Sequence, residues 1–542
     1  MSASAPVNAG GHLEYRRFGP PGTGKSTSLA RDVGHAVEKF GSAAVLVASY
    51  SKAAAIEIAS KCDTIEPSHV GTLHAMGLRA LGRPRVVDGR AVADWNTIAP
   101  AFRLGLKGKL DADDPLADVS DGTPTAGDEI RERYELLRAR CVPRAMWRGD
   151  VAGFAAQWEE WKAENDLVDF GDMICRPLEE CPVAPGAPTV GFFDEAQDFS
   201  AAEWALVRRW AGAMDYVVCV GDDDQSIYGF RGADPEAFLN PPLPDEQIRV
   251  LAQSYRVPAT VHALASRWIS RVRGRQPKEY RPRQENGETV QGAVRRPFVR
   301  LADREAVTAM VGRYAEDGRT VAILASCSYL LSGVVSELRR QGVPFHNPWR
   351  KSRGDWNPLT PGRGVSTADR LIAWLGPSRR ADGSAWTLEE LKRWSSIVAS
   401  GGVLSPGAKS AIAKADVLSY ADLVRWVPAE TLAAGAAGDM PYLMRALLAA
   451  KAKAAEFPAR VIERRGPDAL ESKPRVIVST IHGAKGGQAD VVILAPDLSR
   501  AGAEEWERGA ASVRRLFYVG ATRAREELVI LEPNNGRMAV DL

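Results

Sequence analysis

A glycine-rich segment near the start of the chain carries residue types that bind phosphate. Residues 19–26 read Gly-Pro-Pro-Gly-Thr-Gly-Lys-Ser and fit the pattern GxxxxGK[ST], between a short apolar segment and a helical pattern. Glycines let backbone N–H groups surround a phosphate, and the following helix adds its dipole. We expect Lys25 to reach the β- and γ-phosphates and Ser26 to ligate Mg²⁺. The residues expected to line this nucleotide site are Gly19, Pro20, Pro21, Gly22, Thr23, Gly24, Lys25, Ser26 and Thr27.

A pair of carboxylates follows the apolar run at 190–193. Asp194 and Glu195 open the sequence Asp-Glu-Ala-Gln-Asp. Phosphoryl transfer to water needs a carboxylate that holds the metal and a base that orients the attacking water. We assign the metal to Asp194 and the base to Glu195. Standing alone, this segment would be interpreted as a solvated acidic loop, but the phosphate-binding segment favours chemistry.

The rest of the sequence predicts the elements that position these groups. Short β-branched runs alternate with helical patterns, which is typical of parallel sheets in α/β domains. Those runs are 45–48, 190–193, 216–220, 321–325, 476–479 and 491–494. A chain of 542 residues exceeds what one hydrophobic core supports, so we expect two such cores. Strand-poor stretches at 82–160 and 349–473 predict mostly helical insertions.

Composition excludes several classes of protein. The chain is 45% hydrophobic and 25% charged, which is an ordinary globular balance. No run of about 18 apolar residues predicts a membrane span, and residues 1–18 lack a secretory signal, so we expect a cytoplasmic protein (in the host cytoplasm if viral). Six scattered cysteines without a CxxC pair argue against a zinc site or disulfide framework. The net charge of +2 leaves nucleic acid open as a partner.

Several segments, taken together, resemble the motifs of the UvrD/Rep family of superfamily 1 helicases. The most specific is Val220–Ala233, VGDDDQSIYGFRGA, which is close to the family's third motif along its whole length. Four further segments resemble the second, fourth, fifth and sixth motifs, in that order: Asp194–Asp198, Leu251–Arg256, Ser479–Gly486 and Arg515–Ala524. Two smaller matches are Gly71–His74 and Val168–Met173. They follow the family's order from about residue 19 to 525.

The resemblance implies an ATP- and Mg²⁺-dependent motor with two RecA-like cores. The first core would take residues 1–81 and 161–240, with an insertion at 82–160. The second would take 241–348 and 474–542, with a reduced accessory domain at 349–473. Single-stranded and tailed duplex DNA are the implied partners, and 3′ to 5′ is the implied direction of movement.

The resemblance also implies roles for single residues. Gln225 would sense the γ-phosphate, and Arg256 and Arg523 would neutralise charge on the transferred phosphoryl group, as arginine fingers do. Tyr255 would stack on the adenine, and Gly486 and Gln488 would lie by the nucleotide. The implied DNA-binding residues are Tyr50, Thr72, His74, Tyr228, Phe230, Arg231 and His482. Core packing is the alternative for the aromatic residues, and a structural role for the histidines.

The sequence departs from the family in four places. Residues 1–18 contain no counterpart of the family's adenine-reading glutamine. Thr27 stands where the family has an arginine, and Gln488 where it has a glutamate. Residues 48–52 replace an aromatic-containing segment, so we expect one base-binding pocket to be rebuilt around Tyr50.

Four functions remain to be compared. The leading hypothesis is an ATP-dependent DNA helicase, and the alternative is a translocase that displaces proteins without processive unwinding. A helicase–nuclease is disfavoured because the sixth motif ends near Arg525, close to Leu542. A generic P-loop signalling ATPase would not explain residues 225–231. Two basic segments, 267–283 and 347–356, could bind nucleic acid. The alternative for 267–283 is a solvated helix end, and the alternative for 347–356 is a packed turn.

Overall fold

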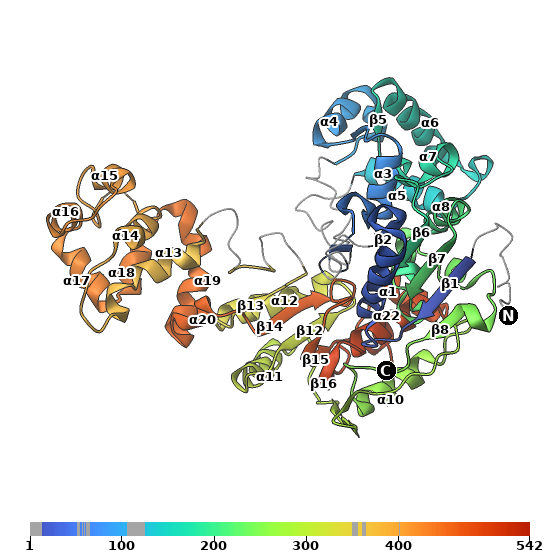
Figure 1. Cartoon of the computed structure of the whole chain (residues 1–542). Helices are drawn as coiled ribbons and strands as arrows, with labels where there is room; N and C mark the ends of the chain where they lie inside the picture. The colour runs from blue at the N-terminus through green and yellow to red at the C-terminus, as the bar shows by residue number, and fades with distance from the viewer. Residues whose placement is uncertain are drawn as a thin grey trace.

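The computed structural model describes residues 13–50, 55–56, 58, 60, 65–105, 125–349, 356–359, 365–399 and 401–542. Residues 106–124, within the first predicted insertion, and most of 350–364 lie outside these residues. Figure 1 shows helices α13 to α20 gathered on one side of the molecule, beside β13 and β14. The blue and green helices of the first half of the chain lie on the other side.

The first sheet is parallel throughout and has the order β3-β2-β6-β7-β1-β8. Its strands are β1 (Leu13–Phe18), β2 (Val45–Ser49), β3 (Val70–Thr72), β6 (Val190–Asp194), β7 (Tyr216–Gly221) and β8 (Ile248–Val250). All residues of β2 and β6 are buried, as expected when helices cover both faces of a parallel sheet. Packed around this sheet are α1 (Lys25–Phe40), α3 (Leu73–Ala80), α7 (Asp172–Glu180), α8 (Ala201–Ala211) and α9 (Pro235–Leu239).

The second sheet is also parallel, with the order β11-β16-β15-β12-β14-β13. Its strands are β11 (Ala293–Arg295), β12 (Val321–Ala325), β13 (Phe345–His346), β14 (Val476–Thr480), β15 (Ala489–Leu494) and β16 (Ala524–Ile530). The accompanying helices are α10 (Ala259–Ile269), α11 (Arg304–Glu316), α12 (Ser328–Arg340), α21 (Arg500–Glu507) and α22 (Ala511–Ala521). The predicted α/β class with two parallel-sheet cores is confirmed.

One strand crosses the boundary that we drew between the cores. We ended the first core at residue 240, but β8 pairs with β1 in the first sheet, with Phe18 opposite Val250. The strand has three residues and only partial burial, too weak a pattern to mark it in the sequence. The chain therefore leaves the first sheet just before Leu251, where the fourth motif begins.

Each insertion has a core of its own that is rich in tryptophan. The first contains β4 (Arg85–Val86), α4 (Gly89–Ile98), α5 (Ala126–Ala139), α6 (Gly149–Glu164) and β5 (Leu167–Val168), with Trp95, Trp158 and Trp161 at its centre. It extends past the predicted end at residue 160, because α6 continues to Glu164 and β5 pairs with β4. The second packs around Trp374, Trp386 and Trp394. Its helices are α13 (Thr367–Trp374), α14 (Leu388–Ser395), α15 (Ala408–Lys414), α16 (Tyr420–Trp426), α17 (Ala429–Ala437), α18 (Met440–Arg445), α19 (Ala449–Arg465) and α20 (Asp468–Glu471). None of the helices that the structure describes is long and apolar enough to cross a lipid bilayer.

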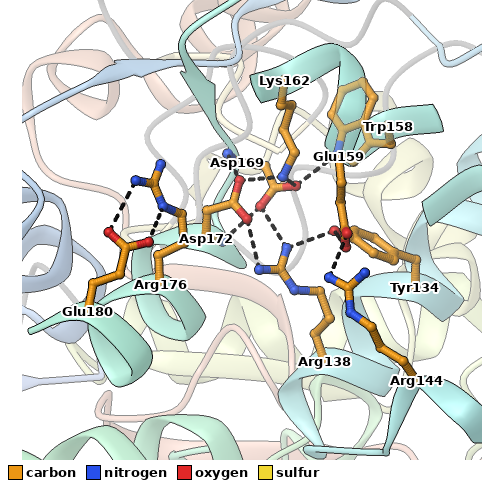
Figure 2. Close-up of polar contacts among 10 residues, drawn as sticks. All are labelled: Tyr134, Arg138, Arg144, Trp158, Glu159, Lys162, Asp169, Asp172, Arg176 and Glu180. Atoms are coloured by element: carbon orange, nitrogen blue, oxygen red, sulfur yellow. Dashed lines mark hydrogen bonds and ion pairs between the residues drawn. The ribbon is translucent and has the colours of Figure 1, made fainter. Parts of the chain in front are cut away.

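A buried ionic cluster fixes the first insertion to the first core (Figure 2). Arg138 of α5 donates to Asp169 and Asp172 at 3.2 and 2.8 Å, and Lys162 of α6 contacts the same two carboxylates. Trp158 adds a hydrogen bond of 2.8 Å to Asp169. Asp172 begins α7 and Asp169 lies three residues before it, so the small motif at 168–173 joins helices of the insertion to a core helix.

Candidate functional site

The phosphate-binding loop connects β1 to α1. Gly22 and Gly24 have left-handed backbones with φ of 77° and 76°, which glycine adopts without strain. Gly24 caps α1 without a side-chain hydrogen bond, so the N–H groups of the first turn face the loop without a side-chain acceptor from the cap residue. The Lys25 ammonium lies inside the loop and donates to the Gly19 carbonyl at 2.8 Å. Exposed helix N–H groups and an inward ammonium are the chemistry that a triphosphate needs.

The two carboxylates of the second motif lie at the same edge of the sheet. Asp194 ends β6 and is buried, and Glu195 follows it in a left-handed conformation with φ of 52°. Burial opposes ionisation of Glu195, but Lys485 and Lys25 outweigh burial and lower its pKa. Because β1, β7 and β6 are neighbours in a parallel sheet, their carboxyl ends bring the loop and these carboxylates together.

Gln225 connects the two cores at this site. Its side-chain nitrogen donates to Asp222 at 2.6 Å, and its side-chain oxygen accepts from Arg523 at 3.1 Å. Its backbone carbonyl accepts from Lys485 at 2.8 Å. Arg523 and Lys485 belong to the second core, so the third motif of the first core is in direct contact with the fifth and sixth motifs.

The second core also contacts the phosphate-binding loop. The Tyr255 backbone N–H donates to the Gly22 carbonyl at 2.8 Å, and the Ser254 hydroxyl donates to the Pro21 carbonyl at 3.0 Å. A Cβ atom on Gly22 would lie 2.5 Å from the Cβ of Arg256, so only glycine permits this approach. The ring of Tyr255 is exposed and lies beside Gly24, where one face is open to a base.

The two predicted arginine fingers differ in their surroundings. Arg523 is 2% exposed and is held by the Val519 carbonyl at 2.9 Å; burial and the nearby Arg256 lower its pKa to about 9. Arg256 is half-buried and donates to the side-chain oxygen of Gln488 at 2.9 Å. The departure from glutamate at 488 therefore leaves an acceptor for Arg256, without a negative charge.

Four predicted DNA-binding residues form one aromatic cluster that spans both cores. Tyr50 stacks on Tyr228 with ring centroids 5.1 Å apart. His482, from the second core, lies 6.0 Å from the Tyr228 ring and 5.4 Å from the Phe230 ring. The Phe230 ring is 56% exposed, whereas Tyr228 is buried. Burial lowers the pKa of His482 to about 4, so its ring is neutral at physiological pH.

The other predicted DNA-binding residues have partners within the protein. The Arg231 guanidinium hydrogen-bonds Tyr50. Thr72 caps α3 by accepting from the Ala75 N–H at 3.2 Å. His74 lies 3.7 Å from a Glu203 carboxylate oxygen, with its ring against Phe170. The structure thus places Thr72 and His74 beside the first core rather than in the aromatic cluster.

Thr27, predicted to line the nucleotide site, is exposed on α1, and Gly486 is exposed with a left-handed φ of 81°. Trp349 contacts Gly487, where an added Cβ would lie 1.9 Å from the indole ring. The packed turn is therefore the better interpretation at Trp349, while residues 350–355 lie outside the described part of the chain.

Sequence reasoning missed three residues that contact the candidate site. Gln197, which is fully buried, accepts from the Asp222 N–H at 2.8 Å and donates to Glu195 at 2.5 Å, so it joins the second motif to the third. Lys485 contacts Asp198 and lies 5.1 Å above the Tyr228 ring. Lys278, in the basic segment that we interpreted mainly as a solvated helix end, is buried among aspartates. Gln197 lies inside the second motif and Lys485 inside the fifth, and this position was the sequence signal that could have identified them.

An insertion helix contacts the loop that carries Phe230. Arg140, just after α5, donates to the Gly229 carbonyl at 3.3 Å. A Cβ atom on Gly232 would lie 2.9 Å from the Cβ of Ala139, so the helix end is close to the backbone of this loop. The ionic cluster of Figure 2, which holds α5, therefore also supports the exposed aromatic ring.

Two family models match the chain at its two cores. Residues 144–242 match the UvrD/REP helicase N-terminal domain, and residues 475–531 match the UvrD-like helicase C-terminal domain. Similar curated proteins include the ATP-dependent DNA helicase UvrD2 of Mycobacterium tuberculosis, 28% identical over 290 residues that cover 47% of this chain and 41% of the relative. The ATP-dependent DNA helicase PcrA of Leuconostoc citreum is 25% identical over 283 residues, covering 48% of this chain and 37% of the relative.

The PcrA helicase of Staphylococcus aureus is 29% identical over 151 residues, or 26% of this chain and 20% of that protein. The chain thus spans about two fifths or less of the length of these relatives. The two matched ranges contain part of the site: the first includes β6, β7 and the third motif, and the second includes β14 to β16, whereas the phosphate-binding loop and the fourth motif lie outside both. Parts of both cores thus match models of UvrD/REP-type helicase domains, and about half of the chain is similar to ATP-dependent DNA helicases of that type.

Proposed function

We propose that the chain is an ATP-dependent DNA helicase that moves 3′ to 5′ along single-stranded DNA and separates tailed duplexes. One observation supports this most. Gln225 contacts Arg523 of the second core, and Tyr228 and Phe230, three and five residues later, contact His482 of the same core. A single short segment therefore links the nucleotide contacts to the aromatic contacts.

The residues of the loop fit Mg²⁺ and ATP. The helix N-terminus and Lys25 would hold the phosphates, and Ser26 and Asp194 would hold the metal. Bound Mg²⁺–ATP supplies the phosphoryl bond to be broken and a metal that screens its charge. Glu195, ionised because two lysines lower its pKa, orients water and takes its proton. Arg256 and Arg523 approach from the second core and stabilise the charge that builds up on the phosphoryl oxygens.

The aromatic cluster suits a motor that must hold any sequence. Every base has a π-face, so stacking on exposed rings is tolerant of sequence. Phe230 offers such a ring, with Tyr228 and His482 behind it. Movement of the two cores toward each other around a nucleotide would carry Arg523 and His482 together, because both belong to the second core. Nucleotide turnover thereby alternates the grip on the strand.

The central test combines a variant with a tailed duplex. Lys25→Ala is expected to abolish DNA-stimulated ATP hydrolysis while leaving single-strand affinity within about threefold, since the aromatic cluster is untouched. A labelled duplex with a 3′ tail should release its strand, and one with a 5′ tail should not. Undiminished hydrolysis by Lys25→Ala would exclude the assignment.

The same assay separates the alternative translocase. A translocase would displace streptavidin from a biotinylated single strand but would leave the tailed duplex intact. Repeating the hydrolysis assay with each NTP in turn measures the selectivity for the nucleotide base. Because Tyr255 offers a stacking face without base-edge contacts, we expect GTP to support turnover within about tenfold of ATP.

A further inference from the structure

A buried lysine lies among three consecutive aspartates at the start of the third motif. Asp222, Asp223 and Asp224, here named the acidic triad, follow β7 and are fully buried. The Lys278 side chain is 1% exposed, and its ammonium lies 2.8 Å from Asp222 and 2.9 Å from Asp224. It also contacts Asp223. One ammonium group therefore contacts three carboxylates.

The other carboxylate oxygens of the acidic triad are also occupied. Arg275 donates through Nε to the third aspartate at 2.8 Å, and the Gln276 backbone N–H donates to the second at 3.0 Å. The first aspartate accepts from the side chain of Gln225 at 2.6 Å. Each oxygen of the triad thus has a donor, as a buried acidic group requires. The arrangement is complete without any further ligand.

Three hydrogen bonds in series connect Lys278 to Arg523. The ammonium holds one oxygen of Asp222, and the other oxygen of Asp222 orients the Gln225 amide. That amide presents its oxygen to Arg523 at 3.1 Å. An amide has one donor end and one acceptor end, so fixing its NH₂ on Asp222 leaves its oxygen for the arginine.

The segment that carries Lys278 also holds the phosphate-binding loop. It follows α10 of the second core, and the Tyr280 hydroxyl donates to the Pro21 carbonyl at 2.9 Å. The Arg281 backbone carbonyl accepts from Ser254. Residues 275–281 thus join the acidic triad, the phosphate-binding loop and the fourth motif.

Oxygens of the three aspartates lie close enough together to ligate one divalent cation. One oxygen from each aspartate can be chosen so that all three lie within 4.8 Å of one another, and carboxylate oxygens are the ligands that Mg²⁺ prefers. An ion bound there would compete with Gln225 for Asp222. The Lys278 ammonium places a positive charge at this position and, unlike a bound ion, it is covalently attached to the chain.

We propose that Lys278 is a positioning residue for the Gln225–Arg523 pair, acting through Asp222, and that its ammonium excludes divalent cations from the acidic triad. The first part rests on the proposed function, because it concerns the rate of ATP hydrolysis. The second concerns cation binding alone and does not depend on turnover.

The test compares wild type, Lys278→Met and Lys278→Arg. Methionine keeps the length and removes the charge, so we expect kcat for DNA-stimulated ATP hydrolysis to fall about 10²-fold, as misplacement of a catalytic group by about 1 Å does. The KM for ATP should change by less than about threefold, because the ion pairs that the structure describes for Lys278 go to the acidic triad and not to the phosphate-binding loop. Arginine, which restores the charge, should recover part of kcat.

A second readout counts bound Mn²⁺ by electron paramagnetic resonance without nucleotide. Lys278→Met should bind one more Mn²⁺ than wild type, and that ion should raise its melting temperature; Lys278→Arg should bind no additional ion. A wild-type kcat in Lys278→Met overturns the positioning role, and an unchanged Mn²⁺ count overturns the exclusion of cations.

Two further controls keep the outcomes distinct. If Lys278→Met does not fold even with Mn²⁺, Asp222→Asn replaces it. This variant leaves Lys278 two carboxylates but gives Gln225 a weaker acceptor, so kcat should fall with KM unchanged, and a wild-type kcat would overturn the positioning role. If wild type itself shows no DNA-stimulated hydrolysis, the proposed function fails, whereas the Mn²⁺ count still decides whether Lys278 excludes cations.

Discussion

Replacement of Arg523 by alanine should nearly stop ATP hydrolysis. Its guanidinium is the only second-core side chain for which the described contacts include the Gln225 side chain, at 3.1 Å. Arginines that stabilise a transferring phosphoryl group contribute about 10³-fold or more to kcat. A loss of 10³-fold corresponds to about 4 kcal/mol of activation free energy. We therefore expect kcat of Arg523→Ala to fall by at least that factor.

The same change should also reduce stability. Arg523 makes hydrogen bonds to Val519, Gly487 and Thr522 within its own core. At about 1 kcal/mol net for each bond, their loss costs at most about 3 kcal/mol, partly offset because a buried charge is removed. Thermal unfolding measures the loss of stability separately from the loss of kcat, and mant-ADP binding shows whether the nucleotide site remains intact.

Two variants sharpen the assay. Arg523→Lys keeps a charge but cannot bridge Val519 and Gln225 at once, so its kcat should remain at least about 10²-fold below wild type. Arg500→Ala removes a 92% exposed arginine of the same core and should leave kcat unchanged. A kcat for Arg523→Ala within about threefold of wild type, in a folded protein that binds mant-ADP, would refute the assignment of this arginine.

Three further predictions concern the DNA grip, acid stability and the insertion. Phe230→Ala should weaken single-strand binding by about 1–3 kcal/mol in a fluorescence titration, whereas Phe298→Ala, an exposed ring outside the cluster, should not. His482, with a folded pKa of about 4 against an unfolded value of about 6.5, binds protons more readily when unfolded, so stability is lost as pH falls between these values. Between these pH values, urea titrations should show that wild type loses up to about 3 kcal/mol more unfolding free energy than His482→Asn. Equal losses in the two proteins would contradict this prediction. Lys162→Met should cost about 3–5 kcal/mol of unfolding free energy because it strands buried carboxylates. The exposed Arg176 pair with Glu180, drawn beside it in Figure 2, gives the matched control Arg176→Met, which should cost below about 1 kcal/mol.

Features encoded in short continuous segments could be predicted from the sequence. The phosphate-binding loop and Asp194 follow apolar runs directly, and parallel strands bring their carboxyl ends to one edge. The β-branched runs at 190–193 and 321–325 are fully buried strands, so their composition was sufficient to indicate sheets. The resemblance then placed Gln225 and Arg523 in one site, where the structure shows them in contact.

Features that depend on contacts between distant segments could not be predicted. Lys278 lies more than fifty residues from the acidic triad in sequence, and a lone lysine in a basic run is ordinarily solvated. The carboxylates at 169 and 172 were recognised as part of a motif, but their partners Arg138 and Lys162 belong to insertion helices without a distinguishing pattern. Strand β8 was missed because three residues give no periodicity to detect.

In the proposed function, the five-residue spacing between Gln225 and Phe230 couples the nucleotide contacts to the DNA contact. Two single-turn 3-10 helices, at 223–225 and 229–231, fix the backbone between them, and the Tyr228 ring is buried against Tyr50. A segment held in this way cannot absorb a displacement of Gln225 by local flexing, since close-packed side chains transmit strain. A shift of Arg523 in response to the nucleotide must therefore reach the exposed Phe230 ring, and a glycine insertion after Ser226 should uncouple ATP hydrolysis from strand release while leaving hydrolysis measurable.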